Sequence, residues 1–436
     1  MTLVCPKCFG DRAISRRIQE VRPQYPDEKC SFHPRNKGVP IRLVAAMVDD
    51  VFRYFYSFGE YPYAYSEQEG DSLVFCVGDI TQAEDEEIAR ALADQLIEDD
   101  EYWPQNGEQS FYADDQNYVR HGFNRNHRND NLWRNFRESV VYQQRFFNSN
   151  AKDLISELFS GVDAQRDHRR QSPVYEISPG SDLGIFYRAR VLSDPKERAR
   201  AREEPASVLG PPPKRLRKAG RMSPAGIACF YGAFDLETCV AELRPPVGSV
   251  VVYGKFELTR PIWVLDTTRF EAPMKPQSLF SKDYLRKVEQ WAFMQRFMED
   301  IAKPVSPTDE HLDYIPTQAV AEYLRVHHQF KRDGHQRKID AIIYRSAQLP
   351  ANRNIAILGE AAEVGNEPGL RPKRQRETLA GASLPDSMEL FLTESRPGPP
   401  PAIQAIKSSV TSMRVESARY QTEDYFEITS DDVFPF

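Results

Sequence analysis

The stretch GRMSPAGIACFYGAFDLETCVAEL, residues 220–243, decides the fold class that we expect for the second half of the chain. Pro224 and Gly226 predict a turn, because both residue types favour turn conformations. The apolar run IACFYGA (227–233) then predicts a buried strand, and Asp235 is placed to cap the helix that completes the stretch. A turn, a strand and a helix in this order indicate an α+β domain.

Three polar residues interrupt this apolar stretch. Arg221 precedes the predicted strand, Tyr231 lies near its end, and Glu242 lies on the predicted helix. Arg binds phosphate oxygens, Tyr stacks on a planar base, and a carboxylate accepts hydrogen bonds from sugar hydroxyls and stabilises positive charge on a sugar ring. Such a set suits a phosphorylated, aromatic, sugar-containing ligand. An Arg–Glu ion pair beside a core Tyr would explain the same residues.

The rest of the C-terminal part, residues 171–436, has the texture of strands separated by turns. We expect helices at 282–301 and 317–328, an irregular loop beside this candidate ligand site over residues 194–218, and a surface insertion rich in Pro, Gly and Arg over 360–401. The predicted strands are VYEIS (174–178), IFYRARV (185–191), SVVVYGKFEL (249–258), PIWVLD (261–266) and DAIIYRS (340–346).

The N-terminal segment, residues 1–38, carries two paired half-sites for a metal. Cys5 and Cys8 are separated by two residues, and 21 residues later Cys30 and His33 repeat that spacing. Two residues between ligands let a tight turn place both on one edge of a tetrahedron, so the pattern predicts a zinc knuckle. The alternative is a set of buried thiols beside a loop histidine.

Residues 39–170 show apolar residues at helical spacing, which predicts an all-helical domain. We expect Asp79 and Thr81 to cap the second helix, and Phe147 to belong to the third. The four stripes contain Val44, Val48, Val51 and Phe55; Ile88, Leu92 and Leu96; Trp133, Phe136, Val140 and Phe147; and Leu154 and Leu158.

Composition limits the function classes. The chain has 436 residues, a net charge of −7 and 40% apolar residues, which describes a multidomain globular protein and excludes a broadly basic nucleic-acid binder. The basic run at 198–218 lacks interleaved aromatic residues. Three interpretations of this run stay open: a solvated loop, a loop that attracts an anionic ligand, and a contact with nucleic acid. Six cysteines and no long apolar run predict a cytoplasmic protein without a membrane partner.

The stretch 220–243 resembles the signature of the RES family, named for its Arg, Glu and Ser. IFYRAR, with Arg188, is similar to the first strand of that family, and LGPPP (209–213) is similar to a loop of its longer members. DAIIYRSA and NIAIL (354–358) resemble the late strands that present the family serine, here Ser346. The resemblance implies an ADP-ribosyltransferase-like domain with a mixed, split β-sheet core that consumes NAD+.

Roles for single residues follow from this resemblance. It implies that Arg221 holds the phosphate or ribose of NAD+, that Tyr231 stacks on nicotinamide and that Glu242 stabilises the oxocarbenium ion. Ser346 would position the ligand or the incoming nucleophile, and Arg188 would be a second cation of the site.

The predicted helices of 39–170, together with YIPTQAVAEYLR (314–325), resemble the members that join a HEPN-type domain to RES. HEPN domains are often ribonucleases through an Arg-x-x-x-x-His motif, but none of the eight histidines has an Arg five positions earlier. We therefore expect this domain to be structural or an interaction platform.

The resemblance favours an NAD+ phosphorylase that turns NAD+ and phosphate into nicotinamide and ADP-ribose-1''-phosphate. Such an enzyme depletes NAD+ and acts as a toxin, with an antitoxin or immune protein as partner; we also expect a homo-oligomer and no nucleic acid. An NAD glycohydrolase and an ADP-ribosyltransferase are the enzyme alternatives. A non-catalytic module in which the zinc knuckle and helices bind nucleic acid or protein is the alternative of another class.

Overall fold

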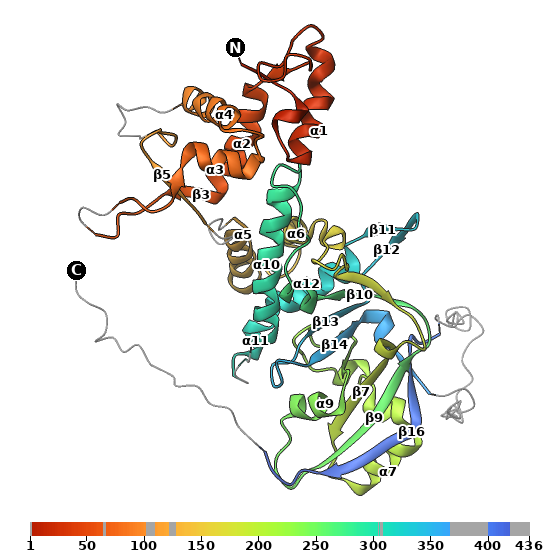
Figure 1. The fold of residues 1–436 in the computed structure, drawn as a ribbon. Helices are drawn as coiled ribbons and strands as arrows, with labels where there is room; N and C mark the ends of the chain where they lie inside the picture. The colour runs from red at the N-terminus through yellow and green to blue at the C-terminus, as the bar shows by residue number, and fades with distance from the viewer. Residues whose placement is uncertain are drawn as a thin grey trace. The chain divides into compact units, whose positions relative to one another are not determined.

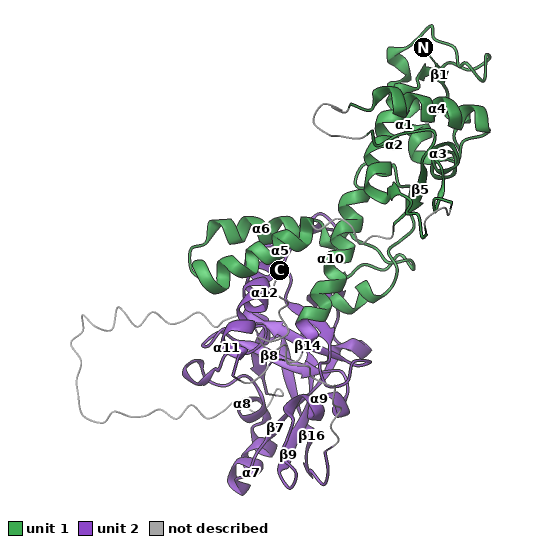
Figure 2. Cartoon of the chain, turned by 90° about the vertical axis from the view of Figure 1, so that its left-hand side faces the viewer, with its two compact units in different colours: residues 1–174, 267–300 green, residues 175–266, 301–436 purple. Residues whose placement is uncertain are grey.

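The chain divides into two units, which Figure 2 shows in different colours. The computed structural model describes residues 2–63, 67–101, 110–121, 128–303, 305, 308–366 and 400–418. Unit 1 contains residues 1–174 and 267–300, and unit 2 contains residues 175–266 and 301–436. Most of the insertion predicted at 360–401 lies outside the described residues.

Unit 1 is mainly helical, but residues 39–170 are not the all-helical domain that the sequence predicted, because they also contain a small three-stranded sheet. Its helices are α1 Arg12–Val21, α2 Arg42–Phe55, α3 Leu73–Thr81, α4 Glu86–Asp99, α5 Arg128–Glu138, α6 Ser149–Phe159 and α10 Tyr284–Ala302, of which unit 1 takes the part up to Asp300. Short strands accompany them: β1 Leu3–Val4 pairs with β2 Val39–Pro40, and β3 Tyr56–Phe58, β5 Asn117–Arg120 and β4 Asp71–Ser72 form a small sheet in that order. Single helical turns are η1 Pro6–Cys8, η2 Arg22–Gln24, η4 Ser139–Gln143, η5 Val162–Ala164 and η8 Thr267–Glu271.

Two details of the helical prediction are wrong. Phe147 does not belong to a helix: it lies between η4 and α6, is fully exposed and has a φ of 53°. Asp79 and Thr81 lie inside α3, and the residue that caps α4 is Asp85, whose carboxylate accepts a hydrogen bond from the backbone N–H of Ile88. The capping error arises because residue types and spacing do not say which of several nearby Asp residues begins a helix. Phe147 follows Val140 by seven residues, a helical spacing that does not show whether the chain between them stays helical.

Unit 2 is built on a mixed sheet (Figure 1), which agrees with the predicted α+β class. In the part of the chain that the structure describes, its strand order is β15-β16-β9-β7-β8-β14-β13-β10-β6. β10 pairs with β13 and β15 with β16 in parallel, whereas β16–β9, β9–β7, β7–β8, β8–β14 and β14–β13 are antiparallel. The strands are β6 Val174–Ile177, β7 Ile185–Val191, β8 Cys229–Ala233, β9 Val250–Leu258, β10 Ile262–Asp266, β13 Ala341–Arg345, β14 Arg353–Leu358, β15 Val364–Gly365 and β16 Ile403–Arg414; β11 Phe330–Arg332 and β12 His335–Arg337 form a separate hairpin.

Helices cover both faces of this sheet. Side chains alternate along a strand, so Phe186 and Ala189 of β7 face opposite sides. Phe186 belongs to a core cluster that includes Leu209, whereas Ala189 packs with Cys239 of α9. The helices of unit 2 are α7 Pro195–Glu203, α8 Pro205–Leu209, α9 Leu236–Leu243, α11 Glu310–Asp313 and α12 Ile315–Val326; its 3-10 turns are η6 Asp182–Gly184, η7 Lys214–Leu216 and η9 Gly359–Ala362.

The segment 194–218 is not irregular, which corrects the prediction from sequence. It contains α7 and α8, and the Asp194 carboxylate caps α7 by accepting a hydrogen bond from the backbone N–H of Lys196. Pro195 occupies the first helical turn, where its missing N–H costs nothing. The sequence did not predict α7 because most of its residues are charged. Only Ala201 of this helix is buried, so no stripe of apolar residues at helical spacing indicates it.

Candidate functional site

The helix α9 carries Glu242 in its last turn. Its N-terminus is capped as predicted, because the Asp235 carboxylate accepts a hydrogen bond from the backbone N–H of Thr238 at 2.8 Å. The Thr238 hydroxyl donates to the same carboxylate and accepts a hydrogen bond from the side chain of Asn352 at 2.8 Å. The connection between β13 and β14 therefore holds the beginning of the helix that presents Glu242.

The other end of this connection holds the Glu242 carboxylate itself. Oε1 of Glu242 accepts three hydrogen bonds: from the Ser346 hydroxyl at 2.6 Å, from Nδ2 of Asn354 at 2.8 Å and from the backbone N–H of Ala347 at 3.2 Å. Ser346 and Asn354 are buried, whereas Glu242 is exposed. The result is an accessible carboxylate in which one oxygen is fixed by three donors.

Ser346 has little hydrogen-bonding capacity left. Its single hydroxyl hydrogen goes to Glu242, and its oxygen accepts the backbone N–H groups of Gln348 at 3.2 Å and Leu349 at 3.1 Å. The structure thus brings the predicted Ser346 and Glu242 into direct contact.

Tyr231 and Arg221 are linked through a tight turn. The Tyr231 hydroxyl accepts a hydrogen bond from the backbone N–H of Met222 at 2.8 Å and lies 3.2 Å from Oγ of Ser223. Burial raises the pKa of Tyr231 well above its usual value, with the neighbouring Cys229 as the next cause, so the hydroxyl stays protonated. Gly220 lies so close to this hydroxyl that a Cβ there would approach it to 2.7 Å.

The Arg221 guanidinium faces a different part of unit 2. Its Nη2 donates to the carbonyl oxygen of Lys303 at 3.0 Å, and its Cζ lies 5.1 Å from the ring centre of Tyr314. Arg221 and Glu242, both among the described residues, form no ion pair with each other. The simple ion pair that the composition allowed is therefore not the arrangement of these two residues.

Arg188 lies where β7 and β8 separate. The two strands share one residue pair, Tyr187 with Ala233, and beyond it Nη1 of Arg188 donates to the main-chain oxygen of Tyr231 at 2.9 Å. Burial, and next the charge of Arg190, lower the pKa of Arg188 to about 10. Arg188 is thus a cation that supports the strand carrying Tyr231, and among the described residues it forms no hydrogen bond or ion pair with Glu242.

Two residues that the sequence did not single out belong to the same region. Tyr344 lies two residues before Ser346, and its pKa is raised by burial first and by the charge of Glu242 second, whereas Arg221 lowers it. Tyr344 therefore lies near both predicted site residues. Asn354 contacts Glu242 directly. A polar residue at the start of the apolar run NIAIL was the available signal for Asn354.

Comparison with known families decides the identity of this region. A family model described as the RES domain matches residues 186–375. The chain contains a RES domain. Comparison with curated proteins gives no match. RES domains form an NAD-consuming, toxin-associated family, so the match supports NAD+ as substrate and an NAD-processing enzyme activity.

A candidate metal centre lies outside the RES domain, in unit 1. Cys5, Cys8, Cys30 and His33 come together as predicted, with one ligand atom from each and all four atoms within 4.8 Å of one another. Sγ of Cys8 lies 3.9 Å from Sγ of Cys5, 3.5 Å from Sγ of Cys30 and 3.5 Å from Nδ1 of His33. A tetrahedral zinc with Zn–S bonds of about 2.3 Å would place two sulfurs about 3.8 Å apart, so the cluster fits that ion.

The surroundings of this cluster also fit a metal. Nε2 of His33, the ring nitrogen that does not face the sulfurs, lies 2.8 Å from a carboxylate oxygen of Glu84. The backbone N–H groups of Cys5 and His33 donate to Sγ of Cys8 and Sγ of Cys30, each at 3.3 Å. A carboxylate behind a ligating His and N–H donors to thiolates orient ligands in metal sites.

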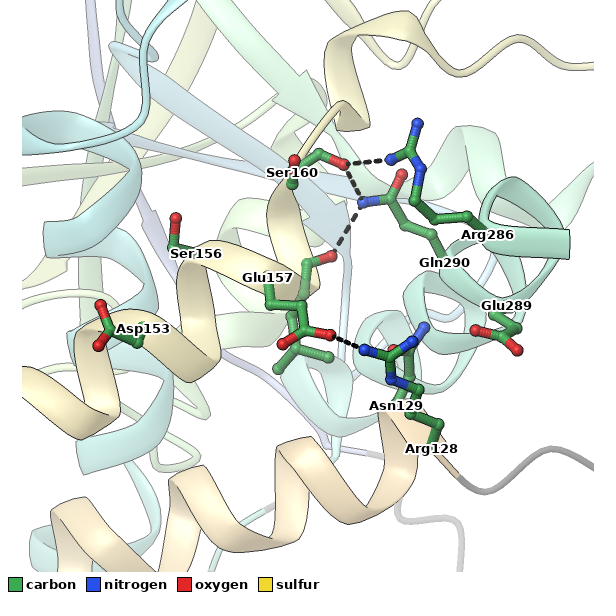
Figure 3. Close-up of a pocket in the computed structure, with 10 residues that line it drawn as sticks. Arg128, Asn129, Asp153, Ser156, Glu157, Ser160, Arg286, Glu289 and Gln290 are labelled. Carbon is green, nitrogen blue, oxygen red and sulfur yellow. Dashed lines mark hydrogen bonds and ion pairs between the residues drawn. The ribbon is translucent and has the colours of Figure 1, made fainter. Parts of the chain in front are cut away.

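Unit 1 also contains a cavity of about 440 Å³ beside α5, α6 and α10, shown in Figure 3. Several of its polar groups contact one another. Arg128 forms an ion pair with Glu157 at 2.6 Å, and the Ser160 carbonyl oxygen accepts hydrogen bonds from Arg286 and Gln290.

In the described part of the chain, no helix combines the length and apolar character needed to cross a membrane.

Proposed function

We propose that the RES domain is an NAD+ phosphorylase whose activity depletes NAD+ and makes the protein a toxin. One observation carries the proposal: in a domain of an NAD-consuming family, Glu242 is an exposed carboxylate with one oxygen held by Ser346, Ala347 and Asn354. A negative charge fixed in place before reaction stabilises a positive charge that develops in the transition state.

The proposed reaction breaks the bond between nicotinamide and C1'' of the ribose. The bonding electron pair leaves with the nicotinamide nitrogen, which becomes neutral, and the ribose becomes an oxocarbenium ion that Glu242 stabilises. An oxygen of inorganic phosphate then attacks C1'' and forms ADP-ribose-1''-phosphate. The phosphate oxygen supplies both electrons of the new bond, so no oxidant or reductant is required.

Arg221 and Tyr231 would bind the substrate. Among the described residues, the Arg221 guanidinium donates one hydrogen bond, to the main-chain oxygen of Lys303, so its other N–H groups can donate to a phosphate or ribose of NAD+. The backbone N–H of Met222 holds the Tyr231 hydroxyl, which fixes the outer end of a ring that could stack on nicotinamide.

The experiment incubates the full chain with NAD+ in phosphate buffer and in phosphate-free buffer and identifies the products by mass spectrometry. ADP-ribose-1''-phosphate that appears only with phosphate supports the proposal. ADP-ribose in both buffers would replace phosphorolysis by hydrolysis, and modified protein would indicate an ADP-ribosyltransferase. Intact NAD+ in both would favour a non-catalytic binding module.

In the cell, we propose that expression arrests growth and that arrest follows the loss of NAD+, with an antitoxin or immune protein as a partner that prevents it. Growth arrest at an unchanged NAD+ concentration would contradict a toxin of this kind. A homo-oligomer is a further proposal, which sedimentation of the purified chain tests.

For the N-terminal part we propose one structural zinc, bound by Cys5, Cys8, Cys30 and His33. Four protein ligands leave no open position, so the ion would stabilise the fold of residues 1–38 and would take no part in the reaction. We retain residues 39–170 as a HEPN-like platform and 171–436 as the part that contains the catalytic domain. Stoichiometric zinc in protein purified without chelator tests the metal.

A further inference from the structure

Asn354 occupies an unusual position for a polar residue. It lies on β14, between β8 and β13, in a strand whose next four residues are Ile, Ala, Ile and Leu. Asn is depleted in strands, and burying its amide without a partner is costly. Asn354 is only 3% exposed, so its amide needs a hydrogen-bond partner to offset the free-energy cost of leaving water.

That partner is Glu242. Nδ2 of Asn354 donates to Oε1 of Glu242 at 2.8 Å, and no other side-chain partner of Asn354 is found among the described residues. The register places Asn354 opposite Tyr344 on β13 and opposite Ala233 on β8, so the three side chains share one face of the sheet. The small Ala233 leaves room beside Asn354 on the face that α9 covers.

The hydrogen bonds to Glu242 are distributed unequally over its two carboxylate oxygens. All three donors, from Ser346, Ala347 and Asn354, reach Oε1, whereas Oε2 accepts none among the described residues. A carboxylate offers about two lone-pair sites on each oxygen, so Oε1 is saturated. Oε2 is the oxygen left to meet a ligand.

We propose that Asn354 is a positioning residue for the reaction: together with Ser346 it locks Oε1 of Glu242 and thereby directs Oε2 at the ribose. This inference rests on the proposed function, because it assigns Asn354 a role in stabilising the oxocarbenium ion. Asn354 is not a catalytic residue, since it acts through Glu242 and is buried behind it.

The test is a double-mutant cycle on NAD+ consumption with the full chain. Asn354→Ala should lower kcat by about 10- to 100-fold, the loss typical for a hydrogen bond to a charged group, with KM for NAD+ changed less than about twofold. In a Glu242→Ala background, measured with enzyme in excess, Asn354→Ala should cost less than about twofold, because the residue that it positions is gone.

Asn354→Asp separates the hydrogen bond from packing. It keeps the shape of the side chain but replaces the donor by an acceptor, so kcat should fall at least as far as in Asn354→Ala while the melting temperature confirms folding. If Asn354→Ala fails to fold, the kcat of Asn354→Asp tests the positioning role in its place. Asn352→Ala, which loses a contact to Thr238 but not to Glu242, shows what anchoring α9 alone contributes.

The outcomes separate the two proposals. An active wild-type enzyme with normal kcat in Asn354→Ala and Asn354→Asp would overturn the positioning role and leave the proposed function standing. Equal losses from Asn354→Ala with and without Glu242, or an equal loss from Asn352→Ala, would assign Asn354 to general structure. A wild-type protein that leaves NAD+ intact would overturn both.

Discussion

The candidate metal centre and the Glu242 region are assembled in opposite ways. The metal ligands lie within 28 residues of one another, from Cys5 to His33, and form two local turns. Glu242 instead meets Ser346 and Asn354 across 104 and 112 residues. A local site can be recognised from spacing, whereas a site assembled by a sheet depends on which strands become neighbours.

The same contrast predicts how each region fails. The N-terminal segment would depend on a bound ion for its fold, since a closed metal site contributes its binding free energy to folding. The RES domain has its own apolar core around Phe186, Phe230 and Phe256, so single substitutions at the site should affect chemistry more than folding. Four predictions test this difference, in order of decreasing effect.

Cys8→Ser should abolish stoichiometric zinc and unfold the N-terminal segment, because metal binding in such sites is worth about 10 kcal/mol or more. Elemental analysis measures the metal, and hydrogen exchange should show lost protection in residues 2–40. Cys76→Ser is the control, since Cys76 is a buried cysteine of α3 outside the cluster. Full exchange protection in zinc-free protein would show that the segment folds without an ion.

Glu242→Gln should lower kcat by about 10²- to 10³-fold, or about 3–4 kcal/mol, by analogy with the loss of one preorganised electrostatic group. Shape and hydrogen bonding remain while the negative charge is lost, so NAD+ binding should change little. Glu237→Gln, an exposed acid on the same helix, should leave kcat unchanged. Near-normal turnover of folded Glu242→Gln would remove this carboxylate from the reaction.

Arg221→Ala should weaken NAD+ binding by about 10- to 100-fold, because a contact from guanidinium to phosphate exists in the ground state as well as in the transition state. Calorimetry of NAD+ binding measures the change. Arg215→Ala removes the same charge from an exposed position of the basic run. Equal losses from both variants would mean that general attraction of an anion, and not a specific contact, explains Arg221.

Glu84→Ala should lower zinc affinity by about 10-fold, the smaller effect expected for a residue that only orients a ligand. Competition with a chelator measures this affinity without any enzyme assay. Glu86→Ala is the matched control, because Glu86 lies two residues away and forms only an exposed ion pair with Arg90. An unchanged zinc affinity in Glu84→Ala would show that His33 is oriented without its partner.

The sequence alone determined the features that rest on neighbouring residues. The cap of α9 by Asp235 and the gathering of the four metal ligands were predicted correctly, since each depends on turns of a few residues. The resemblance to the RES family also came from a continuous motif with Arg221, Tyr231 and Glu242, and the family match at 186–375 confirms it.

Only the tertiary structure decided which of these residues meet. Arg221, on its turn, contacts Lys303 and Tyr314 rather than Glu242, and Arg188 contacts the main chain of Tyr231. Asn354 became part of the site because β14 lies between β8 and β13. The order of strands in a sheet depends on the free energy of the whole core. The residues next to Asn354 in the sequence therefore do not indicate that its partner is Glu242.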